Sequence, residues 1–245
     1  MSTDLPTLVI VGIVAVLAVV QSIFGVGLLL FGTPILLLLG VPFAQVLIYL
    51  LPCSIAVSVL QVATSNLPKY DSFDRKFLIW AVPSVFVGTV LTLSFGSPPR
   101  IKLVVGIVLL LTAILRIGPL SARMQGGVRR AVRPTMVGMG LVHGLSNLGG
   151  GILTVLVGAC YAEKVQVRRH IAFAYGAMAS MQLAVVSVTV HPSVNVALLC
   201  TLPLLAATAF LTVGQRVFRA VGQGFYQVLL NGLILSFGAL LVTAA

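Results

Sequence analysis

Long apolar runs make up most of the chain, and short polar or basic segments separate them. The strongest runs cover residues 8–31, 77–95, 103–115 and 221–245. A helix that crosses a bilayer needs about 20 mostly apolar residues, and these runs lack the period-two alternation of a membrane β-barrel. The pattern therefore predicts an all-α polytopic membrane protein.

Composition narrows the class further. Hydrophobic residues fill 59% of the 245 positions and charged residues 8%, whereas a soluble domain is about a quarter charged. The formal net charge is +11, but Lys and Arg stand in short clusters between apolar runs, as orientation charges do in membrane proteins. We therefore exclude a nucleic-acid-binding protein. Cys53, Cys160 and Cys200 are isolated in apolar sequence and suggest no disulfide framework.

The chain repeats a short glycine-rich pattern. The segment FGVGLLL at residues 24–30 resembles LGGGILT at residues 148–154, with an offset of 124 residues. Self-similarity at a fixed offset indicates an internal repeat. We expect two homologous membrane repeats, residues 1–118 and 134–245, joined by a basic linker at 119–133.

The positive charges distinguish two topologies. Eight simple spans, four in each half, would place eight Lys and Arg on one side and seven on the other. If residues 134–160 instead form a re-entrant hairpin, the split becomes thirteen against two. Cytoplasmic loops are rich in Lys and Arg, so the charges favour the hairpin, and the repeat predicts a matching one at residues 8–40. Each half then has a broken helical hairpin plus three spanning helices, and the halves are inverted repeats, as in many secondary transporters.

The two glycine-rich tips are the candidate substrate site. A helix restarts after each tip, and a helix N-terminus binds anions through its free N–H groups and its dipole. Glycine lets the backbone approach a ligand closely, although small residues also serve close helix packing. The candidate substrate-binding residues at these tips are Gln21, Ser22, Gly25, Gly27, His143, Ser146, Asn147, Gly149, Gly150 and Gly151.

Polar residues on two other predicted spans are candidates for lining a path through the membrane. Ser54, Ser58 and Gln61 are four and three residues apart, which places them on one helical face. Ser180 and Gln182 stand in the corresponding span of the second half. Because serine hydroxyls often bond back to carbonyls of their own helix, a structural role is the alternative for the serines.

The four acidic residues bear on the charge of the substrate. Asp4, Asp71, Asp74 and Glu163 all fall in predicted loops or termini, and residues 70–76 are interpreted as a solvated loop. Intramembrane ionisable residues mark ion sites in many transporters. The absence of carboxylates from the apolar runs therefore favours an anion or a neutral solute.

His143 is the candidate for proton coupling, because it lies near the presumed midplane and imidazole titrates near neutral pH. A structural hydrogen bond to a neighbouring helix is the alternative. His170, beside two arginines, is interpreted as an interfacial residue. His143 and Ser146 lack a third partner and a GxSxG turn, and the sequence contains no metal-binding cluster or nucleotide-binding loop. We expect no enzyme, no metal and no cofactor.

The glycine-rich first element of each half, the basic central linker and the chain length resemble the TauE/SafE sulfite exporter family. The first half departs from the family pattern, with GVG where three glycines are common. The resemblance implies a multi-pass secondary transporter of the bacterial inner membrane. Its substrate would be a small sulfur-containing anion: sulfite, an organosulfonate such as sulfoacetate, or thiosulfate.

Other functions stay open at this point. The same tips would suit a carrier of phosphate-bearing lipid or of another organic anion, and an intramembrane enzyme is the less favoured third class. The sequence does not settle the anion, the direction of transport, the coupling ion or whether two copies form a homodimer.

The charge split predicts that both termini face the periplasm and the linker faces the cytoplasm. In a variant without native cysteines, an impermeant thiol reagent added outside cells should label a cysteine at position 98 but not one at 125. Cysteines at 125 and 165 should behave alike, whereas eight simple spans would place them on opposite faces. Outside labelling at 125 would contradict the model.

Overall fold

The computed structural model describes residues 7–68, 70–114, 126–189, 195–222, 224–226, 228 and 232. All regular secondary structure among these residues is helical, which confirms the predicted all-α class. Five helical stretches in this part of the chain have the length and apolar character of membrane spans: Thr7–Phe24, Phe43–Ala63, Ser72–Phe95, Lys164–Thr189 and Val196–Ala220.

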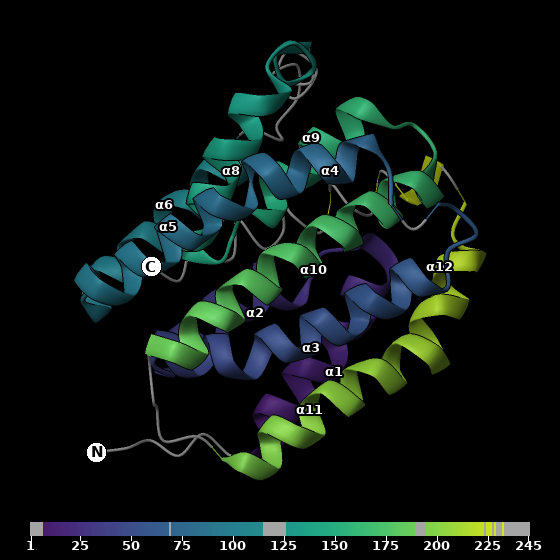
Figure 1. Cartoon of the computed structure of the whole chain (residues 1–245). Coiled ribbons are helices and arrows are strands. Elements are labelled where there is room, and N and C mark those ends of the chain that lie inside the picture. The colour runs from purple at the N-terminus through teal and green to yellow at the C-terminus, as the bar shows by residue number, and fades with distance from the viewer. Residues whose placement is uncertain are drawn as a thin grey trace.

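The helices can be grouped by the two halves that the sequence predicts (Figure 1). Those of the first half are α1 (Thr7–Phe24), α2 (Leu28–Leu38), α3 (Phe43–Ala63), α4 (Ser72–Trp80), α5 (Val82–Phe95) and α6 (Pro98–Ile114). Those of the second half are α8 (Val132–Ser146), α9 (Gly150–Cys160), α10 (Lys164–Thr189), α11 (Val196–Ala209), the π-helix η1 (Phe210–Gly214) and α12 (Gln215–Ala220). Much of the predicted linker lies outside the described residues, but residues 126–130 are helical.

A helix breaks at each glycine-rich segment, as predicted. Three residues separate α1 from α2, and three separate α8 from α9. The first pair folds back on itself, because Gly27 lies against the backbone of Gln21 and Gly32 lies against Leu17. The second helix of each pair has 11 residues, or about 16 Å, which is too short to cross a bilayer. The inverted relation of the halves stays a prediction.

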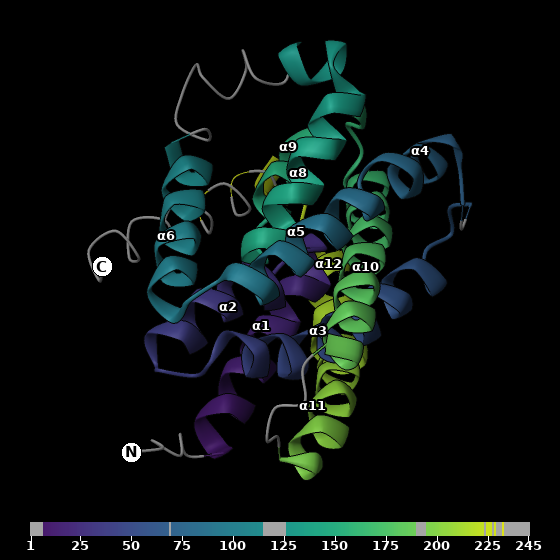
Figure 2. The ribbon, with the colours of Figure 1, turned by 60° about the vertical axis from the view of Figure 1, so that its left-hand side comes forward.

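The two halves are interlocked. The long helices α3 and α10, one from each half, pack against each other along the centre (Figure 1). The third long helix of each half packs on the hairpin of the other half: α5 on α8, and α11 on α1. Figure 2 shows α6 at the side of this bundle, where it contacts α8. The hairpins are therefore held between helices of both halves.

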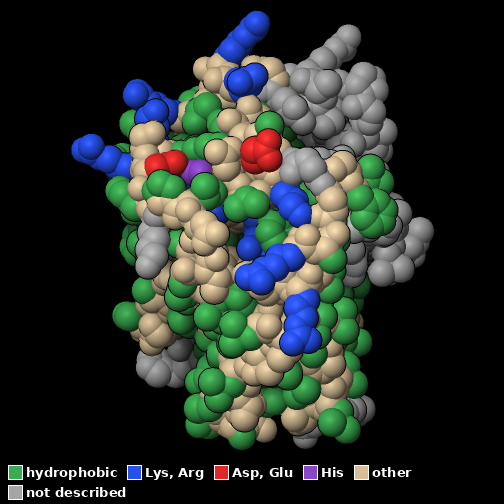
Figure 3. All heavy atoms as spheres, turned by 90° about the vertical axis from the view of Figure 1, so that its right-hand side faces the viewer, with side chains coloured by type: hydrophobic (Ala, Val, Ile, Leu, Met, Phe, Trp, Pro, Cys, Tyr) green, Lys and Arg blue, Asp and Glu red, His purple; other side chains and the backbone are tan. Residues whose placement is uncertain are grey.

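The outer surface suits lipid rather than water. Leu8, Phe95, Val188 and Leu204 are 82%, 73%, 78% and 68% exposed, and hydrophobic side chains cover much of the face in Figure 3. Contiguous apolar surface of this kind marks a membrane or partner contact. The same view faces the side of Figure 1 where α12 and the first turn of α10 lie, and Lys and Arg occupy its upper and middle parts.

Residues 70–76 are not the solvated loop that the sequence suggested. Helix α4 begins at Ser72, and Asp71 and Asp74 form a capping box in which each side chain accepts a hydrogen bond from the other residue's backbone N–H. Asp74 is fully buried and forms an ion pair with Arg169 of α10. The interpretation was wrong because the counter-charge that permits this burial lies 95 residues away in the sequence.

Facing glycines bring α5 and α8 into close contact. A Cβ atom built on Gly88 would lie 2.6 Å from the carbonyl oxygen of Leu141, and one on Gly144 would lie 2.7 Å from the backbone nitrogen of Thr89. Both distances are shorter than real Cβ contacts. Small residues let the backbones of membrane helices approach in this way, so α5 can lie against the helix that leads into the second break.

We expect Gly144→Ala to destabilise the protein by about 1–3 kcal/mol, because the new methyl group would overpack the α5–α8 contact. Gly138→Ala is the matched control, because Gly138 lies on the same helix with open space around it. Thermal unfolding in detergent should show a lower Tm for Gly144→Ala alone. Equal Tm values for both variants would contradict the tight contact.

Candidate functional site

The first break is stabilised from within by Gln21. Its Nε2 donates to the backbone oxygen and the hydroxyl of Ser54, both at 3.0 Å, and to the Ser58 hydroxyl at 3.3 Å. Its Oε1 accepts from the N–H of Leu28 at 3.3 Å, which is the first residue of α2. The structure thus brings together the predicted residues Gln21, Ser54 and Ser58. The N–H that was expected to face an anion has a side-chain acceptor.

The carbonyl groups at the end of α1 also have partners. Gln61 Nε2 donates to the carbonyls of Gln21 and Ser22 at 2.9 and 3.0 Å, and Arg168 donates to the Ser22 carbonyl at 3.1 Å. The Ser22 hydroxyl donates to Ala18 of its own helix at 2.6 Å. The Gln21 and Ser22 carbonyls and the Ser22 hydroxyl are therefore engaged with protein, whereas Oε1 of Gln61 is buried without a hydrogen-bond partner.

The second break has a different construction. Asn147 ends α8 in the left-handed conformation, with φ of 65°, which asparagine tolerates better than most residues. Its Nδ2 donates to the Thr33 hydroxyl of α2 at 2.7 Å. Gln182 Nε2 donates to the His143 carbonyl at 3.2 Å, and the Thr92 hydroxyl donates to the Leu145 carbonyl at 3.1 Å. Helices of both halves therefore hold this break.

Ser146, Ser180 and Gln182, which the sequence also predicted for the site or the path, differ in their hydrogen bonds and in their burial. The Ser146 hydroxyl donates to Val142 of its own helix at 2.7 Å and accepts from the N–H of Leu148 at 3.3 Å. Ser180 is exposed on α10, whereas Gln182 two residues later is fully buried. Of the two pathway candidates on α10, Gln182 is the one that contacts the second break.

Several buried polar atoms around the second break have no hydrogen-bond partner. By bond length and angle they are both ring nitrogens of His143, Oδ1 of Asn147, the hydroxyl of Tyr175 and Oε1 of Gln182, although the Gln182 side chain lies close to the His143 ring and the backbone of Leu29 and Leu30 lies close to the Tyr175 hydroxyl. All four side chains are completely buried. More than nine in ten buried polar groups in proteins are hydrogen-bonded, so this concentration of unpaired atoms indicates a place built for a polar ligand or water.

The start of α9 meets the same atoms. The rings of His143 and Tyr175 lie 5.8 Å apart between their centroids. A Cβ atom on Gly149 would lie 3.1 Å from Nδ1 of His143, and one on Gly150 would lie 3.3 Å from the Tyr175 hydroxyl and 3.3 Å from Val26 of the first break. The N-cap of α9 receives no side-chain hydrogen bond. Of the unpaired atoms, the His143 ring and the Tyr175 hydroxyl can donate a hydrogen bond, whereas Asn147 Oδ1 and Gln182 Oε1 can only accept one. A helix N-terminus beside such donors has the chemistry of an anion site.

The electrostatic surroundings agree with an anion. The acidic residues that the structure describes are Asp71, Asp74 and Glu163, and all three lie at or before the first turn of α4 or α10. None of these carboxylates stands at the second break. A bound anion there would meet helix dipole and neutral donors without a nearby negative charge.

A cavity of 420 Å³ lies close to the second break. The turn at 40–42 borders it together with Gly96 and with Ile101 in the first turn of α6, and its lining is mostly apolar, with Leu37, Phe43 and Leu93 among the side chains. Thr92 also lines it, and this is the residue whose hydroxyl donates to the Leu145 carbonyl. The cavity therefore extends to the polar contact that joins α5 to the end of α8.

A cluster of charged residues at the start of α4 and α10 was missed from the sequence. Asp74 pairs with Arg169, and Asp71 Oδ2 lies 2.8 Å from His170 Nε2. Tyr161 stacks on the His170 ring with centroids 3.9 Å apart. His170 is thus a buried residue, 5% exposed at its side chain, rather than an interfacial one. The motifs DSFD and RRH were visible, but nothing local to either showed that they meet.

Hydrogen bonds fix the charge of Asp71. Burial alone would raise the pKa of its carboxyl, but hydrogen bonds from His170 and from the backbone N–H groups of Asp74 and Phe73 outweigh it. The pKa of Asp71 therefore lies below its ordinary value, and the carboxylate is ionised at neutral pH.

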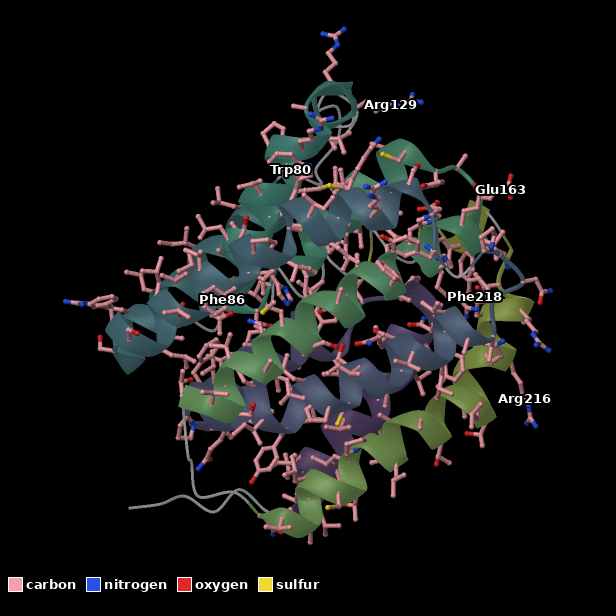
Figure 4. All side chains as sticks on the ribbon, in the orientation of Figure 1. Trp80, Phe86, Arg129, Glu163, Arg216 and Phe218 are labelled. Carbon is pink, nitrogen blue, oxygen red and sulfur yellow. The ribbon has the colours of Figure 1, made fainter. Side chains whose placement is uncertain are left out.

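Basic residues surround the same end of the molecule. The Arg168 guanidinium lies 3.4 Å above the centroid of the Phe218 ring, and Lys164 donates to the Phe218 carbonyl at 3.1 Å. Arg216 and Glu163 point away from the bundle at this end, near Phe218 (Figure 4). Arg168 also reaches the first break, so this basic end connects with the hairpin region.

Comparisons with known proteins agree with the architecture. The family model described as sulfite exporter TauE/SafE matches residues 8–241, nearly the whole chain. No curated protein and no solved structure gives a significant match. The matched region includes both broken hairpins and all five candidate spans. The chain therefore belongs to the sulfite exporter TauE/SafE family, a family of membrane transporters.

Proposed function

We propose that the protein is a secondary transporter of a small sulfur-containing oxyanion, which binds at the second break. The observation that carries this proposal is that the ring nitrogens of His143 and the hydroxyl of Tyr175 are fully buried and unpaired beside the start of α9. The description of the family names sulfite, and an organosulfonate, such as sulfoacetate, and thiosulfate are the other candidates that the resemblance implies.

The donors suit an oxyanion. A neutral His143 ring carries one N–H, and the Tyr175 hydroxyl adds an O–H. The first backbone N–H groups of α9 point along the helix axis toward the break. An anion with three oxygens on one sulfur can accept from donors that converge from several directions. Each hydrogen bond to a charged group contributes about 1.5–3 kcal/mol.

The two tips then have different roles. The first tip is closed by Gln21, Gln61 and Arg168 and supports the structure. The second tip binds the anion. Proton coupling at His143 remains a prediction: because no described carboxylate stands near this ring, its positive charge would be balanced only while an anion is bound.

We expect Gly150→Leu to abolish transport, because the side chain would fill the space between Tyr175 and Val26 where the anion meets the start of α9. Gly158→Leu is the control, since Gly158 lies on the same helix with open space around it. Uptake of labelled sulfite and sulfoacetate into proteoliposomes tests both variants. Wild-type uptake by Gly150→Leu would contradict the site.

His143→Ala should weaken anion binding by about ten- to a hundredfold, which is the loss expected for one hydrogen bond to a charged ligand. Ser180→Ala is the control, because Ser180 is exposed on α10. Equilibrium binding of labelled sulfite and sulfoacetate to detergent-solubilised protein measures the difference. Unchanged affinity in His143→Ala would exclude this ring, and selective transport of a phosphate-bearing lipid would favour the alternative substrate class.

A further inference from the structure

The hydrogen bonds of His170 determine how many protons its ring holds. Nδ1 lies 2.8 Å from the Gln166 carbonyl oxygen, and Nε2 lies 2.8 Å from Asp71 Oδ2. A carbonyl oxygen can only accept, so Nδ1 carries a hydrogen. Nε2 faces a carboxylate oxygen, and a contact at this distance needs one more proton, on the ring or on the carboxyl group. His170 and Asp71 together therefore share one exchangeable proton.

The groups around this pair set its charge. Asp74 of α4 and Arg169 of α10 form an ion pair and add no net charge. Tyr161, from the connection between α9 and α10, stacks on His170, and its hydroxyl donates to Asp71 Oδ2 at 3.4 Å. With the shared proton the whole cluster is neutral, and without it the charge is −1. Asp71 is 34% exposed at its side chain, so water can deliver the proton.

We propose that His170 and Asp71 form a proton-binding site that couples proton movement to anion transport. One proton passes from water into the hydrogen bond between His170 Nε2 and Asp71 Oδ2, and the net charge of the cluster rises from −1 to zero. This inference rests on the proposed anion transport.

Helix α10 connects the pair to both breaks. Ile171, the next residue, lies against Gly25 of the first break. Tyr175 of the proposed anion site comes five residues after His170 on α10, which corresponds to a rise of about 7.5 Å along the helix axis. A charge of −1 at about 10 Å, at an effective dielectric constant of about 20, weakens anion binding by about tenfold.

The coupling has a defined direction. If the protonated cluster favours the anion, linkage requires that the bound anion favours the protonated cluster by the same factor. Proton and anion therefore bind together and move in the same direction. A proton gradient would then drive accumulation of the anion.

A divalent metal is the competing occupant, because one ligand atom each from Asp71, Asp74 and His170 lie within 4.8 Å of one another. The contacts favour a proton. Asp74 Oδ2 is bound to the Arg169 guanidinium and accepts from the N–H of Asp71. Asp71 Oδ1 accepts two backbone N–H groups of α4. A metal cation would have to displace these donors and stand beside a guanidinium.

Nuclear magnetic resonance of the full chain with isotope-labelled histidine tests the pair without any substrate. The chain has three histidines, and His143→Gln and His170→Gln assign their signals. The Nε2 signal of His170 should show the shared hydrogen bond in the wild-type protein and should change in Asp71→Asn, because an amide replaces the carboxylate that faces Nε2. An Nε2 signal that Asp71→Asn leaves unchanged would overturn the pair, as would stoichiometric binding of Zn²⁺ that His170→Gln abolishes.

Binding and transport of methanesulfonate test the coupling. Its charge is constant over the relevant pH range, unlike that of sulfite. Wild-type affinity should fall about tenfold as the pair loses its proton, and the Asp71→Asn profile should be flat. Asparagine can still cap α4, and Glu163→Gln, which neutralises an exposed carboxylate at the same end, is the control.

Proteoliposomes complete the test. Asp71→Asn and His170→Gln should lose proton-driven accumulation while they still exchange labelled for unlabelled methanesulfonate. Accumulation at the wild-type level in either variant would overturn the coupling. If the wild-type protein neither binds nor exchanges any sulfur oxyanion, the proposed function fails, and so does the coupling, while the resonance experiment still decides whether the proton-binding pair exists.

Discussion

Two interrupted helices inside an apolar bundle impose the main constraint on this protein. Each interruption leaves backbone N–H and carbonyl groups without helical partners, and lipid supplies no hydrogen bonds. Side chains from other helices take that role: Gln61 of α3 and Arg168 of α10 at the first break, and Thr92 of α5 and Gln182 of α10 at the second. The polar residues within the spans are explained first by this need.

The same constraint separates structural from functional polarity. Around Gln21 the side-chain amide, the Leu28 N–H and the carbonyls of Gln21 and Ser22 have partners, and Gln61 Oε1 is the unpaired side-chain atom among the residues described at this break. Around His143 and Tyr175 the protein buries polar atoms and leaves them unpaired. Burying an unpaired polar group costs stability, so an arrangement that concentrates several of them is best understood as serving a ligand.

The sequence predicted the parts of the fold that depend on local pattern. The apolar runs predicted the all-α membrane class, and the glycines flanked by polar residues predicted the positions of both helix breaks. The residues 8–40 and 134–160 expected to form hairpins correspond closely to α1–α2 and α8–α9. These features depend on neighbours in the chain, which is why composition and spacing reveal them.

The sequence could not predict features that depend on distant pairs. Gln21 and Ser22 looked like ligand donors, but Gln61 and Arg168, 40 and 146 residues away, turn that tip into a closed hydrogen-bond network. Tyr175 was overlooked because a lone tyrosine in an apolar helix carries no local signal. Asp74 looked solvated because its partner Arg169 lies in the other half.

The pairing of Arg169 with Asp74 also matters for an anion carrier. A buried guanidinium without a counter-ion would be costly to desolvate, and it would attract the transported anion strongly. A site that holds its ion too tightly cannot release it, because transport requires binding that is favourable yet reversible. Asp74 neutralises Arg169 within the protein, so the anion meets a neutral cluster when the His170–Asp71 pair holds its proton. Under the proposed coupling, the charge of this cluster would depend on that single proton, while the buried Arg168 and the exposed basic residues at this end would still attract anions.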